Sequence, residues 1–418
     1  MATGRSFNDM LNEYLPYKLL RAEFSDRSYI FKNIEKDNGW KMGQLIVPFE
    51  AALASSVENG SLTASDDIAD YDYVRGYINT YPEAWGTMQF KQRDLMEHDG
   101  KIPETTFLRI LPNQTNNFME YMRFVLNCQM LNGPVIANLT EDGDTNGTGV
   151  ADVDRIDRFK IGQKCYIYDS DTTAAAVYVT AIDVNNKRVT LSDSRGGSAY
   201  SISSFTEAND ALLYWSGAQT AANRFSSVKT SLLSAANGGT TTLYNQTKTS
   251  YPYLQAWNQD GSDINATNVL AKIFKAVKDV KRFTPGKPTE VWMSYKHFGT
   301  IQTILEAQKG SFKTSEKQHE TEVYAWDEVM IWGPGAKLKL VAMQEMDDDW
   351  IGIIDPGAMK LHSNGFFRKN ISPDGNAYYV SRATTGYTYI CDICFYGDLV
   401  VNKPSFCGII HSVPDYTE

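Results

Sequence analysis

Apolar residues recur at helical spacing most clearly in residues 116–131. There the apolar positions are one to four residues apart: Phe118, Met122, Val125, Leu126 and Met130. This spacing places them on one face and predicts a long core helix. Asn117, three residues before Glu120, resembles a capping box at its start. Asn132-Gly133-Pro134 predicts its end.

The C-terminal half alternates between helical and strand patterns. Residues 269–281 predict an amphipathic helix, with Ile273, Phe274, Val277 and Val280 on one side. Residues 290–293 predict a strand, and residues 294–310 a second helix. Further strands are expected at Leu338–Ala342, Trp350–Ile354, Phe366-Phe367, Tyr378–Ser381, Gly386–Val401 and Gly408–Val413. Helices and strands in this mixture predict an α+β fold.

Two N-terminal stretches carry few core positions. In residues 1–35 only a short amphipathic helix is expected, and Pro16 ends it. Residues 36–105 hold short strand patterns at Leu45-Ile46-Val47 and Thr87–Phe90, separated by the polar span Ser55–Asp72. This pattern predicts a projecting hairpin. A two-stranded hairpin is barely stable alone, so it needs a partner surface, which a second subunit can supply.

A small all-β module is expected between the long helix and the C-terminal half. A polar Gly/Asp-rich linker, residues 139–154, precedes it. Its strands are expected at Lys164–Tyr168, Ala175–Val184 and Lys187–Leu191, with Asn185-Asn186 as a two-residue turn because Asn tolerates positive φ. The following Ser/Thr/Ala/Gly-rich stretch, residues 226–248, is expected to be a loop or an interface segment.

Composition narrows the function classes. A chain of 418 residues with 42% hydrophobic and 22% charged residues suits a folded protein of two or three lobes. The net charge of −10 disfavours a basic nucleic-acid-binding surface, although an acidic protein can still enclose nucleic acid. Five cysteines do not make a disulfide framework. Residues 1–20 have no continuous apolar core, so no signal peptide is expected, and no apolar run is long enough for a membrane helix.

The order of these parts resembles the major capsid proteins of tailed phages, which share the Hong Kong 97-type fold. The resemblance lies in the loop Gly39–Gly100, the helix Asn116–Leu131, the segments Val269–Lys281 and Pro288–Gly310, the run Leu338–Leu361 with its Asp355-Pro356 turn, and the closing segment Gly386–Val413. It implies an N-terminal arm, an extended loop, a peripheral domain with the spine helix, a linker with an inserted β module, an axial domain and peripheral return strands. Their expected ranges are, in that order, 1–35, 36–105, 106–138, 139–225, 226–385 and 386–418.

The same resemblance implies a structural protein, not an enzyme, with no cofactor. Its copies would form pentamers and hexamers of an icosahedral shell that encloses double-stranded DNA in a virion, assembled in the host cytoplasm without a membrane. A portal protein would be a partner. No long charged helical segment precedes the arm, which implies that any scaffold is a separate protein or is absent. A decoration protein and the family's Lys–Asn crosslink are left open.

The sequence contains two candidate metal sites, and each of them also has a simpler structural interpretation. Cys391, Cys394, Cys407 and His411 have zinc-finger-like spacing, but they lie in strand-like apolar runs and fit buried cysteines better. Asp142, Asp144 and Asn146 match the first half of a calcium loop whose twelfth position is Val153 instead of Glu. A solvated turn is the simpler interpretation.

Other charged groups are expected to be structural. The run Asp347-Asp348-Asp349 fits a solvated turn better than a cation site, and the basic face of residues 272–282 fits a solvated helix surface. The acid/base cluster formed by Asp94, Glu97, His98 and Asp99 fits an ion-pair patch between subunits better than a catalytic site.

Three hypotheses follow from the sequence. The first is a phage capsid subunit, and the second is an encapsulin-like nanocompartment shell on the same fold. The third is a metal-binding protein or metal-dependent hydrolase that uses one of the two candidate metal sites. The motifs of zinc peptidases, serine hydrolases, P-loop proteins and dinucleotide-binding proteins are absent from the sequence.

Overall fold

The computed structural model of the chain describes residues 28–37, 40, 44–50, 73–79, 82–91, 104–140, 149–169, 172–202, 212–215, 225–284, 286–307, 328–333, 336–363, 368–369, 380–382 and 388–414. The expected helix in residues 1–35 and the polar span Ser55–Asp72 lie outside the described residues. The chain divides into two compact units, of which the first comprises Met1–Leu131 with Ser226–Glu418 and the second Asn132–Phe225. Helices and strands occur together, so the predicted α+β class is confirmed.

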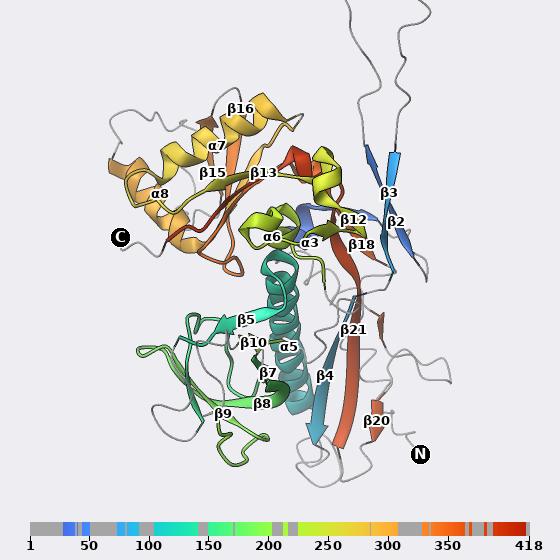
Figure 1. Cartoon of the computed structure of the whole chain (residues 1–418). Coiled ribbons are helices and arrows are strands. Elements are labelled where there is room, and N and C mark those ends of the chain that lie inside the picture. The colour runs from blue at the N-terminus through green and yellow to red at the C-terminus, as the bar shows by residue number, and fades with distance from the viewer. Residues whose placement is uncertain are drawn as a thin grey trace, which may run out of the picture. The chain divides into compact units, whose positions relative to one another are not determined.

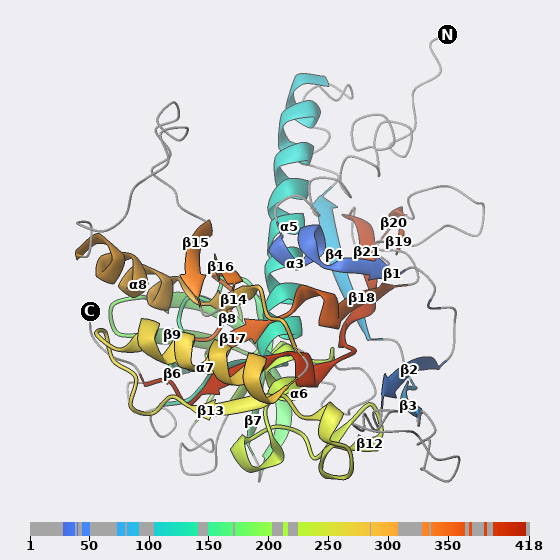
Figure 2. The same ribbon diagram turned by 90° about the horizontal axis from the view of Figure 1, so that it is seen from above.

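The first sheet of unit 1 is built around one long strand, β21 (Thr388–Val401). Every other strand of this sheet except β1 pairs directly with β21 and is antiparallel to it, while β1 pairs with β18 in parallel. These strands are β1 (Glu35–Asp37), β4 (Glu83–Lys91), β18 (Met359–Ser363), β19 (Arg368–Lys369) and β20 (Val380–Arg382) (Figure 1; β1 and β19 are labelled in Figure 2). The strands predicted at Thr87–Phe90 and Gly386–Val401 are thus confirmed as parts of β4 and β21.

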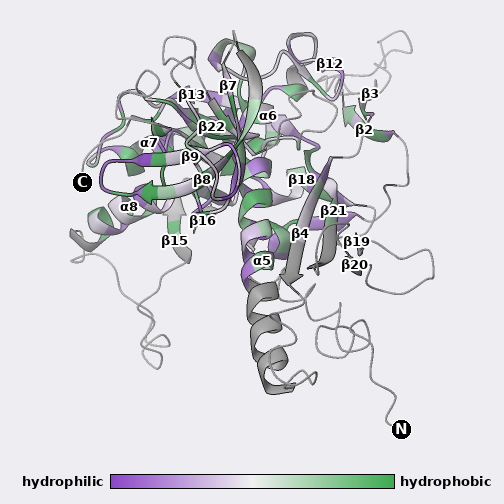
Figure 3. Ribbon diagram, turned by 90° about the horizontal axis from the view of Figure 1, so that it is seen from below, coloured by the Kyte–Doolittle hydropathy of each residue, from purple (hydrophilic) through white to green (hydrophobic). Residues whose placement is uncertain are grey.

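The long helix α5 (Glu104–Asn132) has 29 residues, which gives a length of about 43 Å. It ends at Asn132 as predicted, and Gly133 follows with a φ of 111°. The predicted capping box is wrong because Asn117 and Glu120 lie well inside the helix. The sequence hides the true start, since Pro112 lacks an amide hydrogen and normally ends or kinks a helix. Hydrophobic and hydrophilic positions alternate along the coloured part of α5 in Figure 3.

The helix α5 packs against β4 through a close approach at Gly86. A Cβ atom at that glycine would lie 2.2 Å from Cζ of Phe118 on α5. Any larger residue would therefore have to displace the Phe118 ring. The opposite face of β4 points away from α5, because successive residues of a strand alternate between its two faces.

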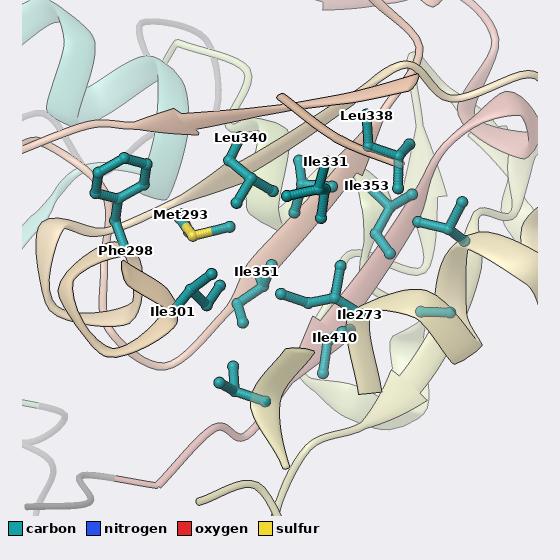
Figure 4. Packing of buried hydrophobic residues seen from close by; sticks show 14 of the residues in the cluster. Ile273, Met293, Phe298, Ile301, Ile331, Leu338, Leu340, Ile351, Ile353 and Ile410 are labelled. Carbon is teal, nitrogen blue, oxygen red and sulfur yellow. The ribbon is translucent and has the colours of Figure 1, made fainter. Parts of the chain in front are cut away.

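The second sheet of unit 1 has six strands in the order β13-β22-β17-β14-β16-β15. Their bounds are Trp257–Asp260, Gly408–His411, Ile351–Ile354, Glu290–Met293, Ala336–Ala342 and Glu328–Gly333. Helix α7 (Val269–Phe283) contacts β13, β17 and β22, and α8 (Tyr295–Ala307) contacts β16 (Figure 2). Figure 4 shows Ile273 of α7 among Ile351, Ile353 and Ile410 of the sheet.

Most predictions for this second sheet are confirmed. The helices expected at 269–281 and 294–310 are α7 and α8, although residues directly beyond Ala307 are not described. The strand expected at 290–293 is β14, with all four residues buried. Strands β13 and β15 were not expected, because their sequences, Trp-Asn-Gln-Asp and Glu-Val-Met-Ile-Trp-Gly, lack clear alternation.

Residues 226–248 were expected to form a loop or an interface segment, and the prediction of a plain loop is wrong. They contain the short helix α6 (Val228–Leu232), a 3-10 turn and the strands β11 (Thr242–Leu243) and β12 (Gln246–Thr247). Helix α6 has only five residues and depends on caps at both ends. Ser227 accepts a hydrogen bond from Thr230 N, and Lys248 Nζ donates to the carbonyls of Thr230 and Leu233 at 3.0 and 2.7 Å.

Unit 2 is a sheet in the order β5-β10-β7-β8-β9-β6. The bounds are Val135–Asn138, Leu212–Tyr214, Lys164–Asp169, Thr172–Asp183, Arg188–Ser192 and Val150–Asp152. The three strands predicted for the β module are confirmed as β7, β8 and β9. Cys165, Val177, Val189 and Leu191 are among the side chains that form its core.

The predicted two-residue turn between β8 and β9 is wrong. Asp183 pairs with Arg188, so the turn has four residues, 184–187. The positive φ, 52°, falls at Lys187 and not at an asparagine. The Asp183 carboxylate accepts hydrogen bonds from the amides of Asn185 and Asn186 at 3.1 and 3.3 Å, which closes the wider turn.

A separate two-stranded sheet, β2 (Leu45–Glu50) with β3 (Tyr73–Ile78), belongs to unit 1 (Figure 1). It confirms the strand expected at Leu45–Val47. Helix α3 (Tyr29–Asn33) precedes β1. Within the described residues, no helix combines the length and the apolar character that a membrane span requires.

Candidate assembly surface

The chain that follows residue 27 is held to α5 by a line of buried polar groups. Ser28 is the N-cap of α3, and its side chain accepts a hydrogen bond from Phe31 N at 3.4 Å. Its hydroxyl donates to Asn127 Oδ1 of α5 at 3.1 Å, and Asn127 Nδ2 donates to Glu345 Oε1 at 3.0 Å. Since both Ser28 and Asn127 are buried, these bonds fix the place where the N-terminal segment joins the body.

Tyr29 holds the same segment to the second sheet. Its hydroxyl donates to Glu290 Oε1 at 2.6 Å, and Trp292 Nε1 donates to the other carboxylate oxygen at 2.8 Å. The Tyr29 ring meets the Trp292 ring edge-on at 6.2 Å, and Lys339 Nζ lies 4.9 Å from its centroid. Tyr29 thus combines a charge-assisted hydrogen bond with aromatic and cation–π contacts.

The hairpin β2–β3 is held at its root by one aromatic stack. Phe49 of β2 stacks on Tyr244 with ring centroids 5.8 Å apart and an interplanar angle of 7°. Gly76 of β3 lies beneath this stack, and a Cβ atom there would come within 2.5 Å of Phe49 Cε2 and 3.0 Å of Tyr244 Cβ. Only glycine therefore lets the two rings close over β3.

Hydrogen bonds to the backbone of β3 secure the edge of this strand that does not face β2. Tyr77 N donates to Tyr244 O at 2.8 Å, and Asn245 Nδ2 donates to Tyr77 O at 3.0 Å. Gln246 Nε2 donates to Arg75 O at 2.8 Å. Tyr244 and Asn245 have φ values of 48° and 64°, so this edge is made by a left-handed turn between β11 and β12.

A buried carboxylate lies behind this root. Asp398 of β21 is fully buried, and Ser226 N donates to its two oxygens at 2.9 and 3.1 Å. Leu399 N donates to Oδ1 at 2.9 Å. Burial raises the pKa of Asp398 to about 7, although these hydrogen bonds act in the opposite direction.

Tyr244 and Lys248 share this buried environment. The Tyr244 hydroxyl accepts a hydrogen bond from Val401 N at 2.9 Å. Burial, and after it the nearby Asp398 charge, raise the pKa of Tyr244. Burial lowers the pKa of Lys248 to about 8. The root of the hairpin is thus a buried, polar region in which burial disfavours the charged forms of Asp398 and Lys248.

The face of the hairpin that points away from Tyr244 is exposed. In the β2–β3 register Ile46 is opposite Tyr77, and Pro48 is opposite Arg75. Directly opposite residues of an antiparallel pair share a face. Half of the Ile46 surface (50%) is exposed, and Pro48 and Arg75 are exposed as well. We call Ile46, Pro48, Arg75 and Tyr77 the hairpin outer face.

A second exposed face belongs to β4. Trp85 is opposite Cys394, and Glu83 is opposite Tyr396, so these side chains share the face of β4 that points away from α5. Trp85 is 51% exposed, and its ring meets the Tyr396 ring edge-on at 5.9 Å. We call Glu83, Trp85 and Tyr396 the β4 outer face.

The structure does not bring the described members of the Cys/His candidate together. Cys394 is buried in β21, Cys407 is buried before β22, and His411 lies at the end of β22 in the other sheet. Burial raises the pKa of the Cys407 thiol to about 12. For Cys391 only the backbone position in β21 is described. In the described part of the chain, no group of three His, Cys, Asp or Glu residues could hold a metal ion.

The calcium candidate, Asp142, Asp144 and Asn146, lies outside the described residues. The cluster Asp94, Glu97, His98 and Asp99 lies outside them too. For the acidic run, Lys229 Nζ forms ion pairs with Asp347 at 3.3 Å and Asp349 at 2.6 Å. The carbonyl oxygen of Asp348 lies 2.6 Å from Nε2 of the buried His297. This turn is therefore tied to two helices, α6 and α8, rather than simply solvated.

The root residues Gly76, Tyr244 and Asp398 were not among the residues predicted from the sequence. A glycine in a strand pattern is a signal of close backbone approach, and Gly76 was open to that interpretation. Tyr244 and Asp398 carry no local signal, because their partners are more than 100 residues away in sequence.

The sequence matches no family model and no curated protein. Among solved structures, the chain is similar to the capsid of a native GTA particle, with 8% identity, a TM-score of 0.46 and coverage of 92% of this chain and 90% of that one. It is similar to the cyanophage A-1(L) capsid, with 7% identity, a TM-score of 0.48 and coverage of 91% and 90%. It is also similar to the capsid of Myoviridae phage XM1, with 8% identity, a TM-score of 0.43 and coverage of 92% of this chain and 91% of that one. Tailed-phage capsids are the proteins that the sequence was expected to resemble.

Proposed function

We propose that this chain is the repeating subunit of a capsid shell and has a structural, non-catalytic role. The observation that carries the proposal is the hairpin β2–β3. Its root is held by Phe49, Gly76 and Tyr244, while its other face leaves Ile46 half exposed. A large apolar side chain that is half exposed on a paired strand is typical of a protein–protein contact, and a second copy of the chain would cover it.

The body of the subunit suits this role. Each of the two six-stranded sheets of unit 1 has buried residues, and α5 gives an element about 43 Å long. Ser28 and Tyr29 tie the start of α3 to α5 and to the second sheet. Obligate interfaces bury about 2,000–5,000 Å², and the hairpin outer face would contribute to such an area.

We further propose that the copies form pentamers and hexamers of an icosahedral virion shell around double-stranded DNA, assembled in the host cytoplasm with a portal protein. The net charge of −10 would limit adhesion of the shell to the enclosed DNA. Scaffolding and decoration proteins, if the virus encodes them, would be separate chains.

Electron microscopy of the purified full-length chain tests the proposal. We expect closed particles of uniform diameter at high protein concentration. Particles purified from the source should contain double-stranded DNA and a portal protein, whereas packaged enzyme without DNA would indicate a nanocompartment instead. A chain that stays monomeric at every concentration and ionic strength would contradict the proposal.

A further inference from the structure

The edge strand β1 is attached to the first sheet by few contacts. It has three residues, and in the described part of the chain it pairs with β18 alone, from Glu35↔Lys360 to Asp37↔His362. Lys360 Nζ lies 2.9 Å from Glu35 Oε1, but the Glu35 side chain is 61% exposed, so this ion pair contributes little. The strand can therefore separate from β18 at a low cost in free energy.

Three titratable side chains form a row across β1, β18 and β21, whose positions Figure 2 shows. Asp37 is opposite His362, and His362 is opposite Asp398. Because residues opposite each other in a sheet share a face, the three side chains are neighbours. Exposure falls along the row, from 45% for the Asp37 side chain to 9% for His362 and none for Asp398. The imidazole thus lies between a half-exposed and a fully buried carboxyl group.

The buried imidazole lacks a hydrogen bond. Its Nδ1 atom lies 3.3 Å from Asp37 Oδ2. The two atoms are not aligned for a hydrogen bond, and among the residues that the structure describes this nitrogen has no hydrogen-bond partner. A protonated imidazole has an N–H donor at both ring nitrogens. Protonation of His362 would therefore bury a charged donor without an acceptor, which is costly.

The charges around His362 compensate its protonated form only in part. Asp37 and Glu35 of β1 attract it, whereas Lys360 of its own strand repels it. Burial raises the pKa of Asp398 on β21 to about 7. Burial also outweighs the attraction of Asp37 and lowers the pKa of His362 from 6.5. When His362 takes up its proton, Asp398 is therefore already neutral and offers no opposite charge.

We propose that His362 is a pH-sensitive switch for the pairing of β1 with β18, in which protonation of the imidazole releases β1. Release admits water, which accepts the hydrogen bonds that the row does not supply. Helix α3 would stay in place, because Ser28 and Tyr29 hold it to α5 and to the second sheet. The inference concerns a single chain and does not depend on the proposed shell role.

The direction of the switch follows from the lowered pKa of His362. The neutral imidazole favours the paired form, and this contribution is fully present above about pH 6.5. It is lost as the pH falls through the lowered pKa. Acid therefore opens the contact between β1 and β18, and a return to neutral pH closes it.

Hydrogen exchange of the full chain, kept below the concentration at which it associates, tests the switch. Exchange of the β1 amides is measured by mass spectrometry at pH 7.5 and 5.5 and corrected for the intrinsic rates. Their protection should fall about threefold to tenfold at pH 5.5, since one pKa unit corresponds to a factor of ten. The amides of β14, a buried strand of the second sheet, should keep their protection.

Two variants assign the effect to His362 and Asp37. His362→Gln cannot take up the proton, so β1 should be equally protected at both pH values. Asp37→Asn removes the attraction that opposes release, so the loss of protection between pH 7.5 and 5.5 should be larger than in the parent. His411→Gln is the matched control, because His411 lies at the end of β22 in the other sheet. It should respond to pH as the parent does.

The outcomes decide for or against the switch. Equal protection of β1 at both pH values in the parent overturns it, and so does a loss that His362→Gln retains. A loss that β14 shares equally would mean that the whole chain opens, and the local switch would then be wrong. Circular dichroism shows whether each variant is folded. If His362→Gln does not fold, Asp37→Asn decides, because a loss no larger than that of the parent contradicts the proposal.

Discussion

Asp398 at the hairpin root offers a direct test of the buried electrostatics through Asp398→Asn. The carboxyl is fully buried and burial raises its pKa from 3.8 to about 7. Between these two values the folded chain holds a proton that the unfolded chain releases. The free energy of unfolding therefore falls as pH rises from about 4 to about 7. The stabilisation by the proton on Asp398 is fully present below pH 4.

The size of the effect follows from the two pKa values. At about 1.4 kcal/mol for each pH unit between them, the charged form costs about 4 kcal/mol at neutral pH. Asparagine keeps the shape and one carbonyl oxygen, which can accept the bonds that Ser226 N and Leu399 N donate to Oδ1. The lost second oxygen costs about 1–2 kcal/mol. The variant should be more stable than the parent by about 2–3 kcal/mol at pH 7.5 and slightly less stable at pH 4.

Urea unfolding of the unassembled chain, followed by tryptophan fluorescence from pH 4 to 7.5, measures both curves. Burial lowers the pKa of His362, which therefore makes the opposite contribution to the pH dependence. Subtracting the curve of the variant from that of the parent removes this contribution. Lys248, with a pKa lowered to about 8, titrates mainly above this range. Glu83→Gln serves as a control, because it removes an exposed carboxylate of unit 1. Parallel curves for parent and Asp398→Asn, with no crossing, would refute the reasoning.

Three further predictions concern the roots of the two N-terminal segments. Gly76→Ala should lower the free energy of unfolding by about 1–3 kcal/mol, since its Cβ would lie 2.5 Å from Phe49 Cε2; an unchanged urea midpoint would contradict the close approach. Tyr29→Phe should lower the free energy of unfolding by about 1–3 kcal/mol, because Glu290 loses a partner at 2.6 Å in a partly buried site. Equal stability of variant and parent would show that this bond is unimportant. Tyr244→Phe should expose the hairpin to protease at concentrations below assembly, because Val401 N loses its acceptor; a cleavage rate equal to that of the parent would show that the hydroxyl does not hold the root.

The pattern of apolar residues along the sequence predicted those elements whose buried positions recur at a regular spacing. The stripe Ile273, Val277 and Val280 defines one side of α7 and is buried as expected. The strand was predicted with the bounds of β14, and all four of its residues are buried, Glu290 included. In both cases the signal lies in the spacing of neighbours, and spacing is what a sequence records directly.

Local pattern failed where a distant contact outweighed it. Helix α5 begins at Glu104 and continues through Pro112, although proline normally ends or kinks a helix. The chain around Ser226–Lys248 contains α6 because Ser227 and Lys248 cap it, and neither cap has an apolar pattern. The turn at 184–187 is wider than expected because the Asp183 carboxylate binds two of its amides.

For the candidate assembly surface, the sequence by itself predicted strands within residues 36–105, and β2 and β4 confirm two of them. Only the tertiary structure decided which side of the hairpin is covered, and by what. Tyr244 O accepts a hydrogen bond from Tyr77 N, which is more than 160 residues away in sequence. The rings of Trp85 on β4 and Tyr396 on β21 are in edge-on contact. The physical reason is that alternation shows two faces of a strand but not the identity of the surface that buries one of them.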